Sequence, residues 1–234
     1  MAGSLLASLV LALGLTGCST PAPSKPAEVL PAAPEVLAKA ADSMAKIKTV
    51  GVDVQVDQAL TAMTIRSATA KLTAAGESQG TVVIAQGNSN VEFQFVVAKG
   101  TLFLKGATGG YTPLPLSMAA SVYDPTALLR PDTGIAALLR TATGATTEAS
   151  DDVNGVPSWR VRATLDQRIA TSVVPGLSGA ATGVVWIDKA TSHLLKAQVP
   201  VPVTEGDPKS PTAPVTVTLS DFDAPVTITP PPGY

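Results

Sequence analysis

Apolar and polar residues alternate along several segments of the chain, and this period of two indicates strands whose faces meet different surroundings. The clearest examples cover residues 50–57, 91–97, 159–165 and 215–220. One apolar face and one wet face is the pattern of an antiparallel sheet covered on one side. Further strands are expected at residues 65–73, 80–85, 101–104, 183–187 and 194–199, with turn signals such as Asn154-Gly155 between them.

The period changes to that of a helix between residues 35 and 48, where the apolar positions fall on one face. Three shorter helices are expected at residues 126–129, from residue 131 to near Gly144, and at residues 166–174. Asp124 and Asp132 are interpreted as N-terminal caps of the first two. Few helices and many half-apolar strands predict an α+β fold, in which one strongly curved antiparallel sheet packs helices on its apolar concave face.

The N-terminus has the features of a bacterial lipoprotein signal. Residues 4–15 are apolar or small and uncharged, which suits a signal peptide and is too short to span a membrane. They lead into Leu15-Thr16-Gly17-Cys18, and Cys18 is the single cysteine of the chain. We therefore expect lipidation of Cys18. No Lys or Arg precedes the apolar run, which departs from the usual signal, and an ordinary secretory signal is the alternative interpretation.

This interpretation sets the predicted domains and location. Residues 1–17 are the expected signal peptide, and residues 18–34, of which 19–34 hold five prolines, are the expected tether. Residues 35–234 are expected to form a single domain. The lipid on Cys18 would hold this domain on the outer face of the cell membrane, in a periplasm-like envelope space.

Composition excludes several functional classes. Charged residues make up 15% of the chain and the formal net charge is −2, so there is neither the basic stripe of a nucleic-acid-binding protein nor a polybasic membrane patch. A single cysteine excludes intramolecular disulfides and cysteine-rich metal sites. Hydrophobic residues reach 45% but aromatic ones only 4%. Such a chain suits either a smooth apolar cavity or a core packed with small side chains, and composition alone favours the core.

Candidate catalytic residues are few. His193 is the single histidine and sits beside Ser192 at an expected turn, where an exposed role is the simpler interpretation. No Gly-x-Ser-x-Gly motif presents a nucleophile. The adjacent Asp151 and Asp152 are expected to face solvent in a loop rather than to bind calcium. The sequence therefore predicts no enzymatic activity, no cofactor and no metal.

Residues 121–139 resemble the mycobacterial lipoprotein family of LppX, LprA, LprF and LprG. A Tyr123-Asp124-Pro125 helix start is followed by Pro131-Asp132-Thr133-Gly134-Ile135. The resemblance extends to the Cys18 motif, the first helix, residues 80–106, Asn154-Gly155, residues 185–187 and residues 218–220. Phe222 departs from the tryptophan that LprG-like members tend to carry.

The resemblance implies a half-barrel sheet wrapped around helices, with a hydrophobic cavity between them. It also implies binding of acylated lipids such as phosphatidylinositol mannosides, lipoarabinomannan or triacylglycerides, and their carriage toward the outer envelope. The implied partners are the lipid ligand, the membrane through Cys18 and a major-facilitator transporter; no nucleic acid is expected.

Alternation then predicts which side chains would line such a cavity, and Val82 is the first choice because its strand is short and has few bulky neighbours. The predicted lining from the strands is Val82, Ile84, Val91, Phe93, Phe95, Leu102, Leu104, Trp159 and Val161, and from the helices it is Leu128, Leu129, Ile135 and Leu138. Two alternatives stay open: a scaffold lipoprotein with a filled core, and an esterase that depends on His193.

Overall fold

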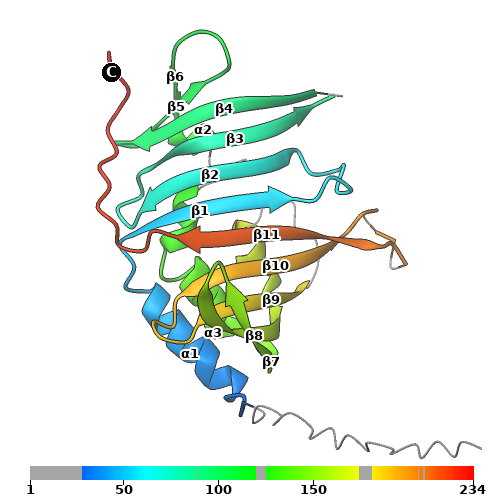
Figure 1. Cartoon of the computed structure of the whole chain (residues 1–234). Coiled ribbons are helices and arrows are strands. Elements are labelled where there is room, and N and C mark those ends of the chain that lie inside the picture. Colours follow the sequence, from blue (N-terminus) through cyan, green and yellow to red (C-terminus); the bar gives the residue numbers. More distant parts are fainter. Residues whose placement is uncertain (1–27, 88, 120–124, 174–180, 205, 208) are drawn as a thin grey trace, which may run out of the picture.

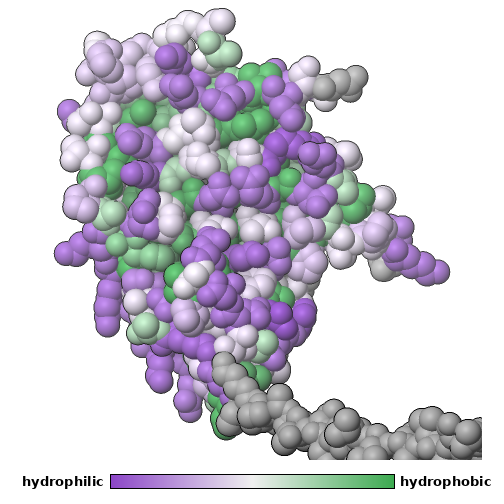
Figure 2. Space-filling model, viewed as in Figure 1, coloured by the Kyte–Doolittle hydropathy of each residue, from purple (hydrophilic) through white to green (hydrophobic). Residues whose placement is uncertain are grey.

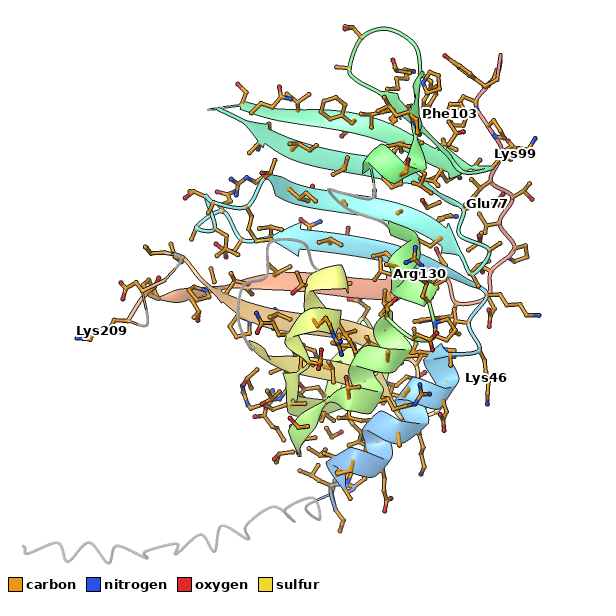
Figure 3. All side chains as sticks on the ribbon, turned by 180° about the vertical axis from the view of Figure 1, so that it is seen from behind. Lys46, Glu77, Lys99, Phe103, Arg130 and Lys209 are labelled. Carbon is orange, nitrogen blue, oxygen red and sulfur yellow. The ribbon has the colours of Figure 1, made fainter. Side chains whose placement is uncertain are left out.

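A single curved antiparallel sheet of eleven strands dominates the computed structural model, which describes residues 28–87, 89–119, 125–173, 181–204, 206–207 and 209–234. Within these ranges the helices lie on one side of the sheet (Figures 1 and 3), so the expected α+β architecture is confirmed. None of the helices in these ranges is long and apolar enough to cross a membrane.

The element bounds are as follows. The strands are β1 Thr49–Val56, β2 Ile65–Thr73, β3 Ser78–Gln86, β4 Ser89–Ala98, β5 Thr101–Lys105, β6 Thr112–Pro115, β7 Thr143–Val153, β8 Val156–Leu165, β9 Ala181–Asp188, β10 Leu194–Pro202 and β11 Thr212–Ser220. The helices are α1 Ala33–Met44, α2 Leu116–Ala119, the 3₁₀ helix η1 Pro125–Leu129, α3 Ile135–Thr141 and α4 Gln167–Val173.

The strand order explains where the helices lie. The sheet runs β6-β5-β4-β3-β2-β1-β11-β10-β9-β8-β7, so β1 and β11 meet in its middle. The first six strands meander to one edge, and the last five return from the opposite edge. The segment between β6 and β7 therefore has to cross a face of the sheet, and it carries α2, η1 and α3. We call the face that it crosses the inner face and the opposite one the outer face.

A core of small and aliphatic side chains lies between the helices and part of the inner face. It joins residues of α1, α3, α4 and η1 to residues of β1, β2 and β8–β11. Val50, Leu72, Val161 and Val215 in the strands are among its fully buried members, and Ala40 and Ala41 bring α1 close to α3. Apolar burial of this kind is the main favourable term in folding.

Helix α1 begins and ends earlier than the sequence suggests. Pro34 lies in its first turn with Glu35, as expected for a helix start. The predicted end at residue 48 is wrong, because the chain after Met44 turns into β1. The Lys48 carbonyl accepts a bond from Ala74 N (2.7 Å), and Lys48 N donates to Asp223 Oδ1 (2.7 Å). These partners use backbone groups that a longer helix would need.

The edge strands β6 and β7 were not predicted from the sequence. β6 carries Pro113 and Pro115, which are tolerated at a sheet edge because no neighbour needs their missing N–H groups. β7 is mostly polar, and its pairing with β8 shifts register twice. An edge strand of this kind needs no strict alternation. Asp151 and Asp152 consequently lie in β7, and their expected placement in a loop is wrong.

The expected cap at Asp132 is also wrong, because α3 starts three residues later with Gly134 at the N-cap. A side chain at Gly134 has no room: an ideal Cβ would lie 2.3 Å from the Leu128 carbonyl oxygen and 2.6 Å from that of Arg130. Glycine is therefore required where η1 folds against α3. The other expected cap, Asp124, lies outside the described residues. The helix expected at 166–174 is confirmed as α4, and the Asp166 carboxylate accepts a bond from Ile169 N (3.1 Å).

The C-terminal segment after β11 is irregular, and it packs on the outer face. Val226 and Ile228 contact the cluster of Val96, Ala98 and Phe103 on β4 and β5. The Tyr234 hydroxyl donates to the Tyr111 carbonyl (2.6 Å). Figure 1 shows this segment, in red, running past the ends of the central strands toward β5 and β6. It ties the β4–β6 edge to the middle of the sheet.

Replacing Gly134 by alanine tests the η1–α3 junction. We expect Gly134→Ala to lower the free energy of unfolding by about 1–3 kcal/mol, the usual cost of overpacking a tight site. Gly110→Ala is the matched control, because no heavy atom lies within 4 Å of its Cβ position. Urea unfolding followed by circular dichroism measures both. Equal stability of the two variants would contradict the requirement for glycine at position 134.

Candidate functional site

Seven of the apolar side chains predicted to line a cavity come together on three neighbouring strands. Val82 opposes Phe93, Ile84 opposes Val91, and Phe95 opposes Leu104. Directly opposed residues share a face of the sheet. We call this set the inner apolar patch; it consists of Val82, Ile84, Val91, Phe93, Phe95, Leu102 and Leu104 on β3, β4 and β5.

The pairing register places the patch on the inner face. Leu72, a member of the helix-covered core, opposes Ser78, and Ala68 on the same face of β2 opposes Val82. The patch therefore continues the face that the helices cover farther along the sheet. Figure 3 shows this side: α1, α3 and α4 lie over the strands below β1, toward β7, whereas the single-turn helix α2 lies over the other half and contacts β5 and β6.

Burial separates the patch from the core. All seven patch residues are half-buried, whereas core residues are at most 9% exposed. Among the described residues the helix-covered core includes none from β3–β6. The patch is thus a contiguous apolar surface that the described helices leave partly uncovered. Such surfaces mark binding sites for apolar ligands or partners.

Two features of the patch were missed in the sequence. Leu114 of β6 opposes Leu102 and extends the patch, but its flanking prolines hid the strand. Ser78 borders the patch opposite Val97; it is fully buried, and its hydroxyl has no hydrogen-bond partner in the described part of the chain. An unpaired buried hydroxyl is costly and calls for an explanation.

The remaining predicted lining residues lie in the core. Leu128, Ile135, Leu138 and Val161 are buried there, and Leu129 packs against it half-buried. Ile135 and Leu138 line an enclosed apolar cavity of about 30 Å³, together with residues of α4 and of β8–β11. This volume is about the share of one water molecule in the liquid. This cavity is therefore much too small for an acyl chain.

Trp159 lies far along the sheet from the patch. It sits on β8, and five strands separate β8 from β3. The Lys189 ammonium lies 3.9 Å from the centre of the Trp159 ring and donates to Glu28 Oε1 and Ser150 Oγ, each at 2.6 Å. The structure thus divides the predicted set into a patch on β3–β5 and a group around the core.

The candidate catalytic residues have structural surroundings. His193 is at a turn as expected, but it is half-buried rather than exposed, since its ring stacks on Phe222 with centres 4.4 Å apart. The Asp188 carboxylate accepts bonds from Ala190 N (2.8 Å) and the Thr191 hydroxyl, which closes that turn.

The acidic pair on β7 is engaged as well. Asp151 Oδ2 accepts bonds from Arg160 (3.2 Å) and from the Trp186 indole (2.9 Å), and Asp152 Oδ1 accepts one from Gly155 N (2.6 Å). Across the described ranges no three His, Cys, Asp or Glu side chains are grouped to hold a metal ion. Cys18 lies outside these ranges.

Solved structures share this arrangement of sheet and helices. LprF from Mycobacterium bovis superposes with a TM-score of 0.73 at 24% identity, covering 86% of this chain and 97% of that one. LppX from Mycobacterium tuberculosis gives a TM-score of 0.58 at 18% identity, covering 84% and 99%. These similarities concern the fold.

Sequence comparison identifies relatives of the same kind. The lipoarabinomannan carrier protein LprG of Mycolicibacterium smegmatis is 33% identical over 161 residues, which span 66% of this chain and 63% of that protein. The protein of the same name from Mycobacterium leprae is 27% identical over 86% of this chain and 83% of its own length. The model of the LppX_LprAFG lipoprotein family matches residues 32–228. The chain therefore belongs to the LppX_LprAFG lipoprotein family.

Proposed function

We propose that this protein is an envelope lipoprotein that binds acylated lipids or glycolipids on its inner apolar patch and carries them toward the outer envelope. The observation that carries the proposal is the half-buried state of seven apolar side chains beside, and not within, the helix-covered core. The names of its relatives, a lipoarabinomannan carrier and a putative diacylated glycolipid transporter, support the same role.

The physical need for a carrier comes from the acyl chains. Each methylene group moved from water to an apolar surface gains about 0.8 kcal/mol, so a lipid with several chains leaves a membrane very slowly. A protein speeds the transfer by offering an apolar surface in place of the bilayer. The seven side chains of the patch are aliphatic or aromatic and carry no charge, which suits this task and requires no catalytic group.

The patch is a better site than the helix-covered core. A cavity of about 30 Å³ between α3 and the sheet cannot take an acyl chain, and drug-sized ligands occupy about 300–1,000 Å³. The alternative, a scaffold lipoprotein with a filled core, would hold if the patch is without a ligand. An acyl chain on β3–β5 would bury side chains that the described helices leave half-exposed.

Ser78 supplies a polar contact at the margin of this site. Its orphaned hydroxyl lies next to Gly80 on the inner face, and Gly80 has no side chain to separate it from Val82 and Phe95. A bound lipid carries ester and hydroxyl oxygens close to its acyl chains. We propose that one of these oxygens pairs with Ser78.

The anchor completes the proposal. Lipidation of Cys18 and the tether over residues 18–34 would hold the domain near the membrane that supplies the lipid, and a major-facilitator transporter is the proposed membrane partner. Phosphatidylinositol mannosides, lipoarabinomannan and triacylglycerides are the candidate ligands. No catalytic role is proposed, since the His193 ring is stacked on Phe222.

A bulky residue in the patch should displace lipid. We expect Val82→Trp to reduce co-purified acylated lipid several-fold while the protein stays folded, because the indole would occupy the apolar surface. Val83→Trp is the matched control, since Val83 lies next in the same strand on the outer face. Native mass spectrometry after gentle extraction from a mycobacterial host measures the bound lipid. Equal lipid in both variants would count against the patch, and none in the wild type would favour the scaffold.

Removing the Ser78 hydroxyl should have opposite effects on stability and binding. In lipid-free protein we expect Ser78→Ala to be neutral or to stabilise by about 1 kcal/mol, because an unpaired buried hydroxyl disappears. In the same variant, lipid retention should fall. Ser158→Ala is the matched control, since Ser158 is equally buried on β8, away from the patch, and its hydroxyl donates to the Asp151 carbonyl (3.4 Å). A clear loss of stability in lipid-free Ser78→Ala would show that the hydroxyl is paired within the protein.

The anchor is tested at its cysteine. We expect Cys18→Ala to abolish the acyl mass on the mature chain and to move the protein from the membrane fraction to the soluble one. Intact-protein mass spectrometry and fractionation measure these changes, with Ser19→Ala as control. An unmodified wild-type chain would support the ordinary secretory signal.

A further inference from the structure

The outer face of the central strands carries a depression that the lipid site does not use, lined by rows of polar side chains and by apolar atoms between and beside them. It is a trough of about 540 Å³ over β11, β1, β2, β3 and β4, open to solvent on the face that Figure 2 shows. We call it the outer polar trough. It lies on the opposite face of β3 and β4 from the inner apolar patch, because alternate residues of a strand point to opposite faces.

The pairing register arranges its side chains in two parallel rows. One row crosses six strands and consists of Thr218, Asp53, Thr69, Thr81, Gln94 and Lys105. The row beside it contains Ser220, Gly51, Lys71 and Gln79 on four neighbouring strands. Opposed residues have Cβ atoms about 5 Å apart. The first row is polar throughout, whereas the second continues on β4 and β5 with the apolar Val96 and Phe103, so polar and apolar surface meet at this end of the trough.

Short residues give the trough its depth. Gly51 has no side chain, and the hydroxyls of Thr69 and Thr81 bond to each other at 2.9 Å. The side chains of Ser220 and Asp221 lie close to the space above Gly51. An ideal Cβ at Gly51 would be 2.9 Å from Ser220 Oγ and 3.3 Å from Asp221 Oδ2. The longer side chains of Lys71 and Gln79 rise beside this floor.

One end of the trough has an aromatic wall. Tyr111 contributes to the lining, its carbonyl accepts a bond from the Tyr234 hydroxyl (2.6 Å), and its own hydroxyl donates to Gln94 Oε1 (3.4 Å). The Lys105 ammonium lies 5.7 Å from the ring centre. The C-terminal segment thus holds an aromatic ring beside a polar floor. An amphipathic ring of this kind contacts a ligand that is polar at its edge and apolar on its face.

The mixture of donors and acceptors defines the ligand class. Asp53 and Asp221 only accept, Lys71 only donates, and the hydroxyls and the Gln79 and Gln94 amides do both. Within the described ranges the side chains of Lys71 and Gln79 have no hydrogen-bond or ion-pair partner, so they are available to a ligand. The carboxylates of Asp53 and Asp221 balance the ammonium groups of Lys71 and Lys105, so the trough has no excess of positive charge to bind a phosphate or another anion. An added peptide strand is excluded because the backbones of the central strands already pair with each other.

We infer that the outer polar trough binds a neutral saccharide, whose hydroxyls both donate and accept and whose ring face packs on Tyr111. This goes beyond lipid carriage, since the trough and the patch lie on opposite faces. The saccharide belongs either to the glycan of a bound glycolipid, which passes around the sheet, or to a separate envelope polysaccharide. Both present the same chemistry to the trough.

The test is an NMR titration of the delipidated protein with soluble α-mannan and arabinan oligosaccharides, which are free of acyl chains. We expect at least one of them to shift the backbone amides of Thr69, Thr81 and Gln94. Gln79→Leu should weaken this binding about tenfold, as expected for the loss of hydrogen bonds at one amide. Gln86→Leu is the matched control, because Gln86 is exposed at the end of the same strand and outside the trough.

The outcomes separate this inference from the lipid proposal. Gln79→Leu should leave the retention of a lipid without a glycan, such as triacylglyceride, unchanged, and Val82→Trp should leave the binding of free oligosaccharide unchanged. Three results would overturn saccharide binding by the trough. These are no shift with either oligosaccharide, shifts confined to the patch, and equal effects of Gln79→Leu and Gln86→Leu. If the trough holds the glycan of the cargo, glycolipid-loaded protein should not respond to added oligosaccharide. If it binds a separate polysaccharide, loaded and delipidated protein should respond alike.

Discussion

The structure depends on one topological constraint: the chain leaves the sheet at one edge and re-enters it at the other. β6 and β7 are the two edges, so the segment between them has to cross the sheet, and a crossing segment is stable only where it covers an apolar face. That segment carries η1 and α3, which α1 and α4 join in the core. Gly134 allows the tight turn within the crossing. The helices thereby cover one half of the inner face and leave β3–β5 as the inner apolar patch.

Strands β3 and β4 carry different kinds of side chain on their two faces. Alternation directs Val82 and Phe93 to the inner face, and Thr81 and Gln94 to the outer one. Strands β3 and β4 therefore offer an apolar surface on one side, and on the other a polar middle flanked by the apolar cluster of Val96 and Ala98. The C-terminal segment links β1 to β5. Asp223 accepts a hydrogen bond from Lys48 N at the start of β1, and the Tyr234 ring contacts Phe103 of β5. A ligand with acyl chains and a glycan would find a matching surface for each part.

A half-covered sheet is a reasonable design for a carrier. A fully enclosed cavity would hold a lipid more tightly, but the protein would have to open before each release. A lipid bound on the inner apolar patch, as we propose, would instead be exchanged without disturbing the core. On the proposed function, stability and binding would be separated: the core of β1, β2 and β8–β11 maintains the fold, while β3–β5 would bind the lipid.

The sequence by itself determined which residues share a face, because a period of two is a local property of each strand. It correctly predicted β1–β5, β8–β11, the helices α1 and α4, and the patch side chains as one-sided sets. It did not predict β6 and β7, whose edge positions require no alternation, nor the start of α3, which the carbonyls of η1 dictate. It also placed Trp159 and Val161 with Val82 in one lining. Only the tertiary structure separated them, because coverage by helices depends on strand order and crossing, which are contacts between residues distant in sequence.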